Sequence, residues 1–143
     1  MTISDLFVVA GVDVSKASLD VAVIGGSIRK SRFENTPEGQ AELAQVLSSA
    51  GCNLTVMEST GGWEAAAACC LQLQELPVAV ANPTRVRSFA KSMGYLAKTD
   101  RVDAKVLAEF AGVLVRKQDL QKFLLPVKDS ARKELEALMT RRS

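Results

Sequence analysis

The sequence predicts an α/β fold in which helices flank a mixed five-stranded sheet, in the order βββ-α-β-α-β-α, followed by one more helix. Two observations support this fold. Short apolar, β-rich runs open the chain, and turn residues separate them closely enough for antiparallel hairpins. Each later apolar run is followed by a helical segment, and such crossovers join parallel strands. At 143 residues, the chain is long enough to bury the core of one domain.

The first three strands are predicted to form an antiparallel meander. The runs "LFVVAGVDV" (6–14) and "SLDVAVIG" (18–25) are separated only by "SKA", which suits a tight turn. The stretch "GGSIRKSRFENT" supplies another turn and a third strand around 28–33.

Helices and strands alternate after the meander. Thr36 as N-cap and Pro37 at the first helical position predict a helix that ends at Gly51. Pro83 begins another helix in the same way. The remaining elements are predicted at 53–59 (strand), 63–75 (helix), 77–82 (strand), 83–93 and 101–117 (helices), and 129–142 (a last, amphipathic helix).

Composition excludes several classes of protein. The chain is 48% hydrophobic and 24% charged, which is typical of a globular protein. Its longest early apolar run is too short for a membrane span and lacks the features of a signal peptide, so we expect a cytoplasmic protein. The absence of histidine excludes histidine-ligated zinc and histidine-dependent triads. The three cysteines form no CxxC pair, and we expect Cys69 and Cys70 to be buried thiols.

Two carboxylates follow apolar strands. Asp13 lies near the end of the first strand, and Glu58 ends the buried strand "LTVMES". Open α/β sheets place their sites at the carboxyl ends of such strands. If the two strands pair in parallel, we expect Asp13 and Glu58 to be neighbours. For Glu58 alone, a role in the turn before "STGG" is an equally good explanation.

Two further acids lie at the start of the 101–117 segment. Helical periodicity places Asp103 within the apolar stripe of that helix, with Asp100 on a neighbouring part of the same face. Capping of the helix by these acids is an alternative that needs no metal. Capping does not explain why Asp103 faces the core, because a buried carboxylate without partners costs several kcal/mol.

Convergence of these four acids predicts a metal centre. Carboxylates gathered in one place repel one another unless a cation holds them together, and Mg²⁺ or Mn²⁺ prefers oxygen ligands. Two such ions about 4 Å apart support in-line phosphoryl transfer. The predicted ligands and catalytic residues are Asp13, Glu58, Asp100 and Asp103.

Three stretches resemble a known family: "GVDVSKASLDVAV", "MESTGGW" and "NPTRVRSFAKSMGYLAKTDRVDAKVLAEFA". They are similar to the DEDD-type insertion-sequence transposases that work with a bridge RNA, a group that includes the Piv-type DNA invertases. The resemblance covers about residues 6–117. It implies an RNase H-like, RuvC-like catalytic domain whose acidic tetrad is Asp13, Glu58, Asp100 and Asp103, binding Mg²⁺ for cutting and joining DNA.

The resemblance also predicts how the chain divides. Residues 1–120 are expected to form the catalytic domain, and 121–143 a linker and the start of a coiled coil. Members of the family continue into a second domain with a nucleophilic serine, and nothing in this sequence matches that serine. We therefore expect a fragment, or a truncated frame, of a protein that forms homo-oligomers through the C-terminal helix.

Positive charge is concentrated in the second half of the chain. Residues 1–80 carry 4 Lys/Arg and 9 Asp/Glu, whereas residues 81–143 carry 14 and 7. This asymmetry favours a polyanionic partner. The family resemblance implies that the partner is DNA, with a guide RNA as a candidate second partner. Trp63 could stack on bases, although packing is the more common role at a helix start. The predicted phosphate contacts are Lys16, Arg85, Arg87, Lys91, Lys98, Arg101 and Lys105, any one of which could be only a solvated surface residue.

Two other functions remain open at this point. An actin-like ATPase or sugar kinase also begins with a strand and a "G-x-D-x-G" turn, but Ser15 stands here in place of the second glycine. A non-catalytic module for nucleic-acid binding or dimerisation is the other alternative. Metal binding at the four acids distinguishes the catalytic function from both.

Overall fold

A computed structural model describes residues 7–96 and 101–124 of the chain. Its sheet has five strands in the spatial order β3-β2-β1-β4-β5. β2 is antiparallel to both β1 and β3, whereas β4 is parallel to both β1 and β5. The predicted mixed sheet with an antiparallel meander is therefore confirmed. The strands are β1 (Val9–Val14), β2 (Ser18–Ile24), β3 (Arg32–Glu34), β4 (Leu54–Glu58) and β5 (Val78–Ala81).

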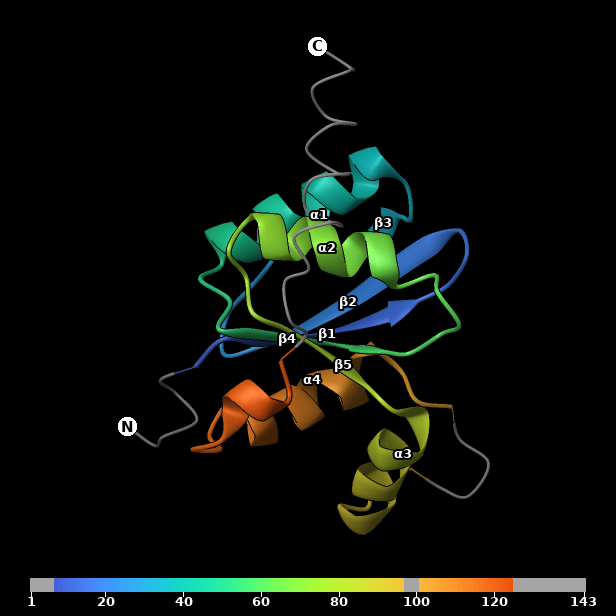
Figure 1. Cartoon of the computed structure of the whole chain (residues 1–143), viewed down its shortest axis with the longest axis vertical. Coiled ribbons are helices and arrows are strands. Elements are labelled where there is room, and N and C mark those ends of the chain that lie inside the picture. The colour runs from blue at the N-terminus through green and yellow to red at the C-terminus, as the bar shows by residue number, and fades with distance from the viewer. Residues whose placement is uncertain (1–6, 97–100, 125–143) are drawn as a thin grey trace.

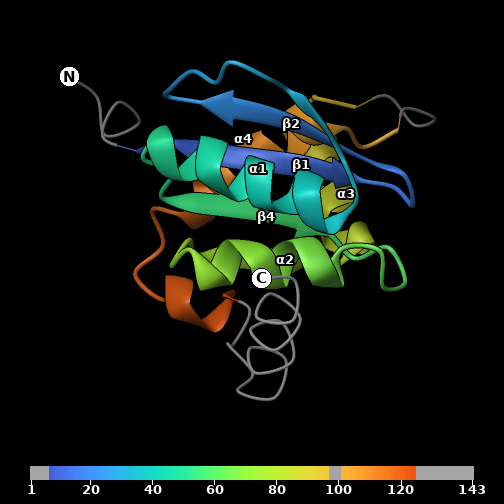
Figure 2. The same cartoon turned by 90° about the horizontal axis from the view of Figure 1, so that it is seen from above.

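Helices cover both faces of the sheet (Figures 1 and 2). α1 (Pro37–Ser49) and α2 (Ala65–Leu73) lie on one face. α4 (Ala104–Leu114) lies on the opposite face, and α3 (Pro83–Ser92) packs beside it. A short 3₁₀ helix, η2 (Leu120–Lys122), follows α4. The sheet thus separates two hydrophobic clusters, one under each helical layer.

The central strand β1 is buried on both faces, as its continuous apolar sequence requires. Ala10 and Val12 pack into the cluster under α1 and α2, whereas Val9 packs into the cluster under α4. Gly11 also faces α4, and a Cβ atom there would overlap the carbonyl oxygen of Ala104. A residue without a side chain therefore lets the first turns of α4 lie directly on β1.

The predicted starts of two helices are confirmed, at Pro37 with its Thr36 cap and at Pro83. The Thr36 hydroxyl accepts a hydrogen bond from the Gly39 N–H at 3.1 Å, and Pro37 is the first residue of α1. The Asn82 side chain likewise accepts from the Thr84 N–H at 2.8 Å, before α3. These caps supply acceptors for N–H groups that have no partner within the helix.

Several boundaries differ from the prediction. β3 is shorter and begins later than the predicted strand, α2 begins at Ala65 instead of 63, and α4 begins at Ala104 instead of 101. The two helix differences matter most, because they take Trp63 and Asp103 out of helices. The predicted helix at 129–142 lies outside the described residues.

The cysteines are free, with Cys52 buried and Cys69 and Cys70 half-buried on α2. Burial raises the pKa of all three thiols, which keeps them protonated at neutral pH. Within the described ranges, no helix has the length and apolar character needed to cross a membrane.

Candidate metal centre and nucleic-acid interface

Asp13 and Glu58 lie side by side at the carboxyl ends of two parallel strands. The register pairs Val12 of β1 with Met57 of β4, so the next residue on each strand is the acid. Side chains alternate along a strand, and Val56 packs under α4, so Glu58 points to the same side. Both acids line one cleft of about 350 Å³. The prediction that Asp13 and Glu58 are neighbours is confirmed.

Residues of three other segments complete the cleft. Thr60 lies in the loop after β4, and Pro83 and Arg87 belong to the first turns of α3. Arg101 and Val102 precede α4. Thr60 was not predicted as a site residue. Its place in "STGG", directly after Glu58, is the signal that could have indicated it.

One carboxylate oxygen of Glu58 is buried and has no hydrogen-bond partner among the described residues. Burial, followed by repulsion from Asp13, raises the pKa of this carboxyl, and the nearby guanidinium groups of Arg87 and Arg101 oppose the rise. The buried oxygen is Oε2. A buried carboxylate oxygen without a partner costs free energy, so this atom is suited to a cation.

Arg101 compensates the charge of Asp13. One of its guanidinium nitrogens donates to both carboxylate oxygens of Asp13, at 3.1 and 2.9 Å. The arginine side chain is 76% exposed, whereas that of Asp13 is 21% exposed. An ion pair with one partner in solvent contributes about 1 kcal/mol or less. A divalent ion can therefore replace this arginine at Asp13 with little loss of stability.

The interpretation of Asp103 as a residue of a buried helical stripe is wrong. Asp103 is the N-cap of α4, its side chain is exposed, and its Oδ1 accepts from the Val106 N–H at 3.0 Å. It lies in a neighbouring hollow with Tyr95, Lys105 and Glu109. The capping hydrogen bond thus explains why an acid occupies position 103, although its carboxylate is not buried.

The structure therefore brings together two of the four predicted acids. Within 7–96 and 101–124, no cluster of three or more acidic or thiol groups is close enough to hold a metal ion. Asp100 lies outside these ranges, as does Lys98. A ligand role for Asp100 and Asp103 stays a prediction.

The predicted phosphate contacts that the structure describes lie at several places. Arg87 and Arg101 line the acidic cleft, and Arg101 also lines the adjoining hollow together with Lys105 and Asp103. Lys16 stands 5.7 Å from the centre of the Trp63 ring. Lys91 is exposed in the last turn of α3.

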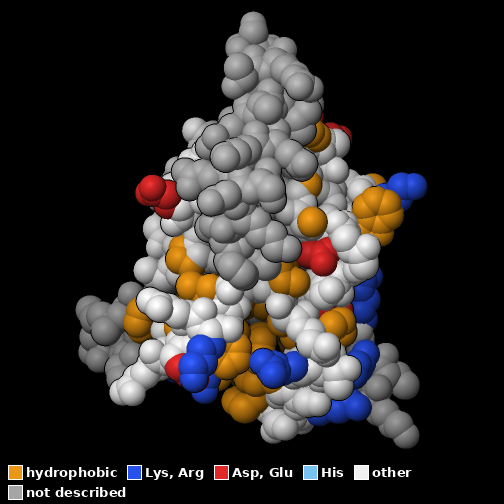
Figure 3. All heavy atoms as spheres, in the orientation of Figure 1, with side chains coloured by type: hydrophobic (Ala, Val, Ile, Leu, Met, Phe, Trp, Pro, Cys, Tyr) orange, Lys and Arg blue, Asp and Glu red, His pale blue; other side chains and the backbone are white. Residues whose placement is uncertain are grey.

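Arg85 belongs to a different surface. Its guanidinium lies 5.7 Å from the centre of the Phe123 ring, and Lys117 approaches the same ring at 5.7 Å. Figure 3 shows Lys and Arg side chains gathered in the lower half of this face, around α3 and the segment after α4, with hydrophobic side chains between them. Cations are therefore spread over the α3–α4 side of the molecule.

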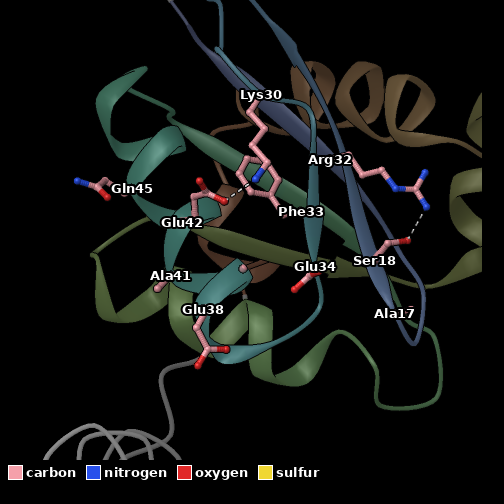
Figure 4. A pocket seen from close by; sticks show the side chains of 11 residues that line it. Ala17, Ser18, Lys30, Arg32, Phe33, Glu34, Glu38, Ala41, Glu42 and Gln45 are labelled. Atoms are coloured by element: carbon pink, nitrogen blue, oxygen red, sulfur yellow. Dashed lines mark hydrogen bonds and ion pairs between the residues drawn. The ribbon is translucent and has the colours of Figure 1, made fainter. Parts of the chain in front are cut away.

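A larger hollow of about 860 Å³ lies between α1 and the edge strand β3 (Figure 4). Its two cations are already paired, because Lys30 contacts Glu42 at 2.7 Å and also lies over the Phe33 ring. Arg32 is 3.4 Å from Asp20. Compared with the acidic cleft, this hollow is a weaker candidate for a cation site despite its size.

Comparison with known proteins agrees with this geometry. The family model of IS110-type DEDD transposases, described as "Transposase", matches residues 10–143. The chain belongs to this transposase family. This membership favours the predicted recombinase over the actin-like alternative.

Similar proteins support the same assignment. The pilin gene-inverting proteins of Moraxella lacunata and Moraxella bovis are each 29% identical over 106 residues, which cover 70% of this chain and 33% of theirs. This transposase-family chain thus matches about a third of the length of those relatives. Thermus thermophilus RuvC has a similar structure, with a TM-score of 0.51 at 15% identity over 84% of this chain and 99% of that one. The RuvC-like, RNase H-like fold is thereby confirmed.

Proposed function

We propose that this chain is the catalytic domain of a DNA transposase, which uses Mg²⁺ or Mn²⁺ to cleave and join DNA strands. The observation that carries the proposal is the pair of adjacent carboxylates Asp13 and Glu58, with a buried, unpartnered oxygen on Glu58. Membership of the transposase family supports a DNA substrate. The RuvC-like fold agrees with it.

The donor set fits a hard divalent cation. Asp13 and Glu58 would hold the ion through carboxylate oxygens, the ligands that Mg²⁺ and Mn²⁺ prefer. When bound, such an ion activates water and stabilises negative charge on a phosphodiester during in-line displacement. We propose that Asp100 and Asp103 complete the ligand set.

The cationic side chains have separate tasks in this proposal. Arg101 neutralises Asp13 when no metal is bound, and after displacement its exposed guanidinium is free to contact a phosphate. Arg87 lies in the same cleft and lowers the negative potential around Glu58. We propose that Lys16, Arg85, Lys91, Lys98 and Lys105 contact other phosphates of the DNA.

Other partners remain predictions that follow from the family. A guide RNA and self-association through the predicted C-terminal helix belong to this group, as does the division into a catalytic domain at 1–120 and a coiled-coil segment at 121–143. The basic side chains around α3 and after α4 are compatible with a second nucleic-acid strand on that side.

Nicking of supercoiled plasmid DNA tests the proposed chemistry, because one cut per molecule is detected. We expect nicking by the chain in Mg²⁺ or Mn²⁺, and complete loss of nicking when EDTA removes the metal. Asp103→Asn is an informative variant, since asparagine keeps the helix cap and removes the charge. If Asp103 is a ligand, this variant loses nicking without losing stability. Nicking that persists in EDTA, or that no divalent ion supports, contradicts the proposal.

A further inference from the structure

Trp63 is exposed on a loop whose Thr60 lines the acidic cleft. It lies in the loop between β4 and α2, three residues after Thr60, which lines the cleft with Glu58. Its side chain is 50% exposed, although burying a residue of this size typically stabilises a fold by several kcal/mol. The packing role expected at a helix start is therefore not the main role of this tryptophan.

Hydrogen bonds hold the Trp63 loop in one conformation. The buried carboxylate of Glu64 accepts from the Thr60 hydroxyl at 3.0 Å and from the Gly62 N–H at 3.1 Å. Gly61 and Gly62 have φ angles of 77° and 122°, which glycine adopts without strain. The ring is thus presented to solvent on a pre-organised loop, which lowers the entropy cost of binding.

A lysine from another loop lies over the Trp63 ring. Lys16 follows β1 and places its ammonium 5.7 Å from the ring centre. The amide nitrogen of Asn35 donates to the carbonyl of Ser15 at 2.9 Å and to that of Trp63 at 3.0 Å. A single side chain therefore fixes the lysine loop and the tryptophan loop relative to each other.

We propose that Trp63 and Lys16 form a binding site for an unpaired base of the DNA substrate. The base stacks on the indole ring, and the phosphate beside it contacts the Lys16 ammonium. Every base has a face that can stack on an aromatic ring, so the site needs no sequence preference. This inference rests on the proposed function, because DNA bound here would have its backbone near Asp13 and Glu58.

The position of the site favours a nucleic acid over a protein. A protein-binding tryptophan usually sits in an apolar patch. Trp63 instead has a lysine over its ring, and its loop contains Thr60, which lines the cleft in which phosphodiester chemistry is proposed. A duplex without an unpaired base cannot offer a base face to Trp63, which makes the inference specific.

Trp63 is the only tryptophan in the chain, so its fluorescence reports directly on the site. In EDTA, which prevents cleavage, the protein is titrated with a fully paired duplex and with the same duplex carrying a short single-stranded flap. We expect the flap to quench Trp63 fluorescence and to bind more tightly. Variants that lack the tryptophan give no such signal, so their DNA binding is measured by the fluorescence anisotropy of labelled DNA.

Trp63→Ala is expected to weaken flap binding by roughly ten- to a hundredfold, which corresponds to the stacking of one base. Trp63→Phe should retain most of the affinity, and both Trp63 variants should bind the paired duplex as the wild type does. Lys16→Ala should weaken flap binding and its salt dependence. Lys30→Ala is the matched control, because Lys30 lies over the ring of Phe33 and not over that of Trp63, and it should change nothing.

The outcomes separate this inference from the proposed function. If the wild type binds both DNAs but Trp63→Ala keeps its preference for the flap, the stacking site is wrong and the proposed function stands. If the wild type binds neither DNA, the proposed function itself is contradicted. A single-stranded RNA of the flap sequence that binds more tightly than the flap would overturn the assignment to DNA.

Discussion

Glu58→Gln is expected to reduce metal-dependent DNA cleavage by about 10³-fold while making the metal-free protein more stable. The loss of activity follows because a metal ion contributes several kcal/mol of transition-state stabilisation, and each 1.4 kcal/mol corresponds to a factor of ten. The gain in stability follows because glutamine removes a buried charge and its repulsion from Asp13. A residue with a purely structural role does not produce these opposite effects.

The stability effect of Glu58→Gln should depend on pH. Because the pKa of Glu58 is raised in the folded protein, the folded state binds this proton more tightly than the unfolded state. The carboxyl therefore contributes stability below its unfolded pKa of 4.5, and this contribution is lost as the pH rises through the higher folded pKa.

Thermal melting in EDTA, at about pH 4 and about pH 7.5, measures this dependence. The variant should melt above the wild type at the higher pH, with a much smaller difference at the lower pH. Glu34→Gln, at an exposed glutamate on β3, is the matched control and should show no such change. A Glu58→Gln variant that is equally destabilised at both pH values would show that the carboxylate has a structural role instead.

Gly11→Ala is expected to destabilise the fold by about 3 kcal/mol, the upper part of the range for overpacked cores. The added Cβ would overlap the carbonyl oxygen of Ala104 and the nitrogen of Ala108 in the α4 backbone, and would lie 2.6 Å from the Cβ of Leu107. Backbone atoms of a helix cannot move aside singly, so α4 must shift from β1. Because Asp103 caps this helix, the shift would also move Asp103 relative to Asp13.

Chemical denaturation measures the loss, and Gly112→Ala is the control on the same helix. A Cβ at Gly112 would meet only the Cγ2 atom of Val9, at the ordinary contact distance of 3.9 Å. Alanine should therefore stabilise α4 there by about 1 kcal/mol through its higher helix propensity. Equal stability of Gly11→Ala and the wild type would contradict the close packing of α4 on β1.

The sheet and half of the candidate site were predictable from the sequence. Hydrophobic runs separated by turns or helices define which strands are antiparallel and which are parallel. Parallel pairing then places the ends of β1 and β4 together, and with them Asp13 and Glu58. This inference needs only strand order and the position of each acid within its strand.

The first residues of the helices were less predictable. The helical pattern of the sequence can include residues that precede the first hydrogen-bonded turn. On a helical wheel, position 103 falls within the stripe formed by Val106, Phe110 and Leu114, which predicts a buried Asp103, whereas in the structure Asp103 is the N-cap. The same error placed Trp63 within a helix, where packing is the usual role. In the structure both side chains precede their helices and are exposed.

Contacts between distant residues had no sequence signal. Arg101 pairs with Asp13 across 88 positions, and Asn35 links loops that follow two different strands. Such contacts depend on how the tertiary fold brings segments together. The sequence indicated that cations lie near the acids, but not which cation compensates which acid.

Anomalous scattering from crystals of the chain grown with Mn²⁺ would locate the proposed ion. We expect an anomalous peak in contact with carboxylate oxygens of both Asp13 and Glu58, with the Arg101 guanidinium displaced from Asp13. A saturated crystal in which Arg101 still binds Asp13, and in which no Mn²⁺ contacts Glu58, would contradict the proposed metal centre.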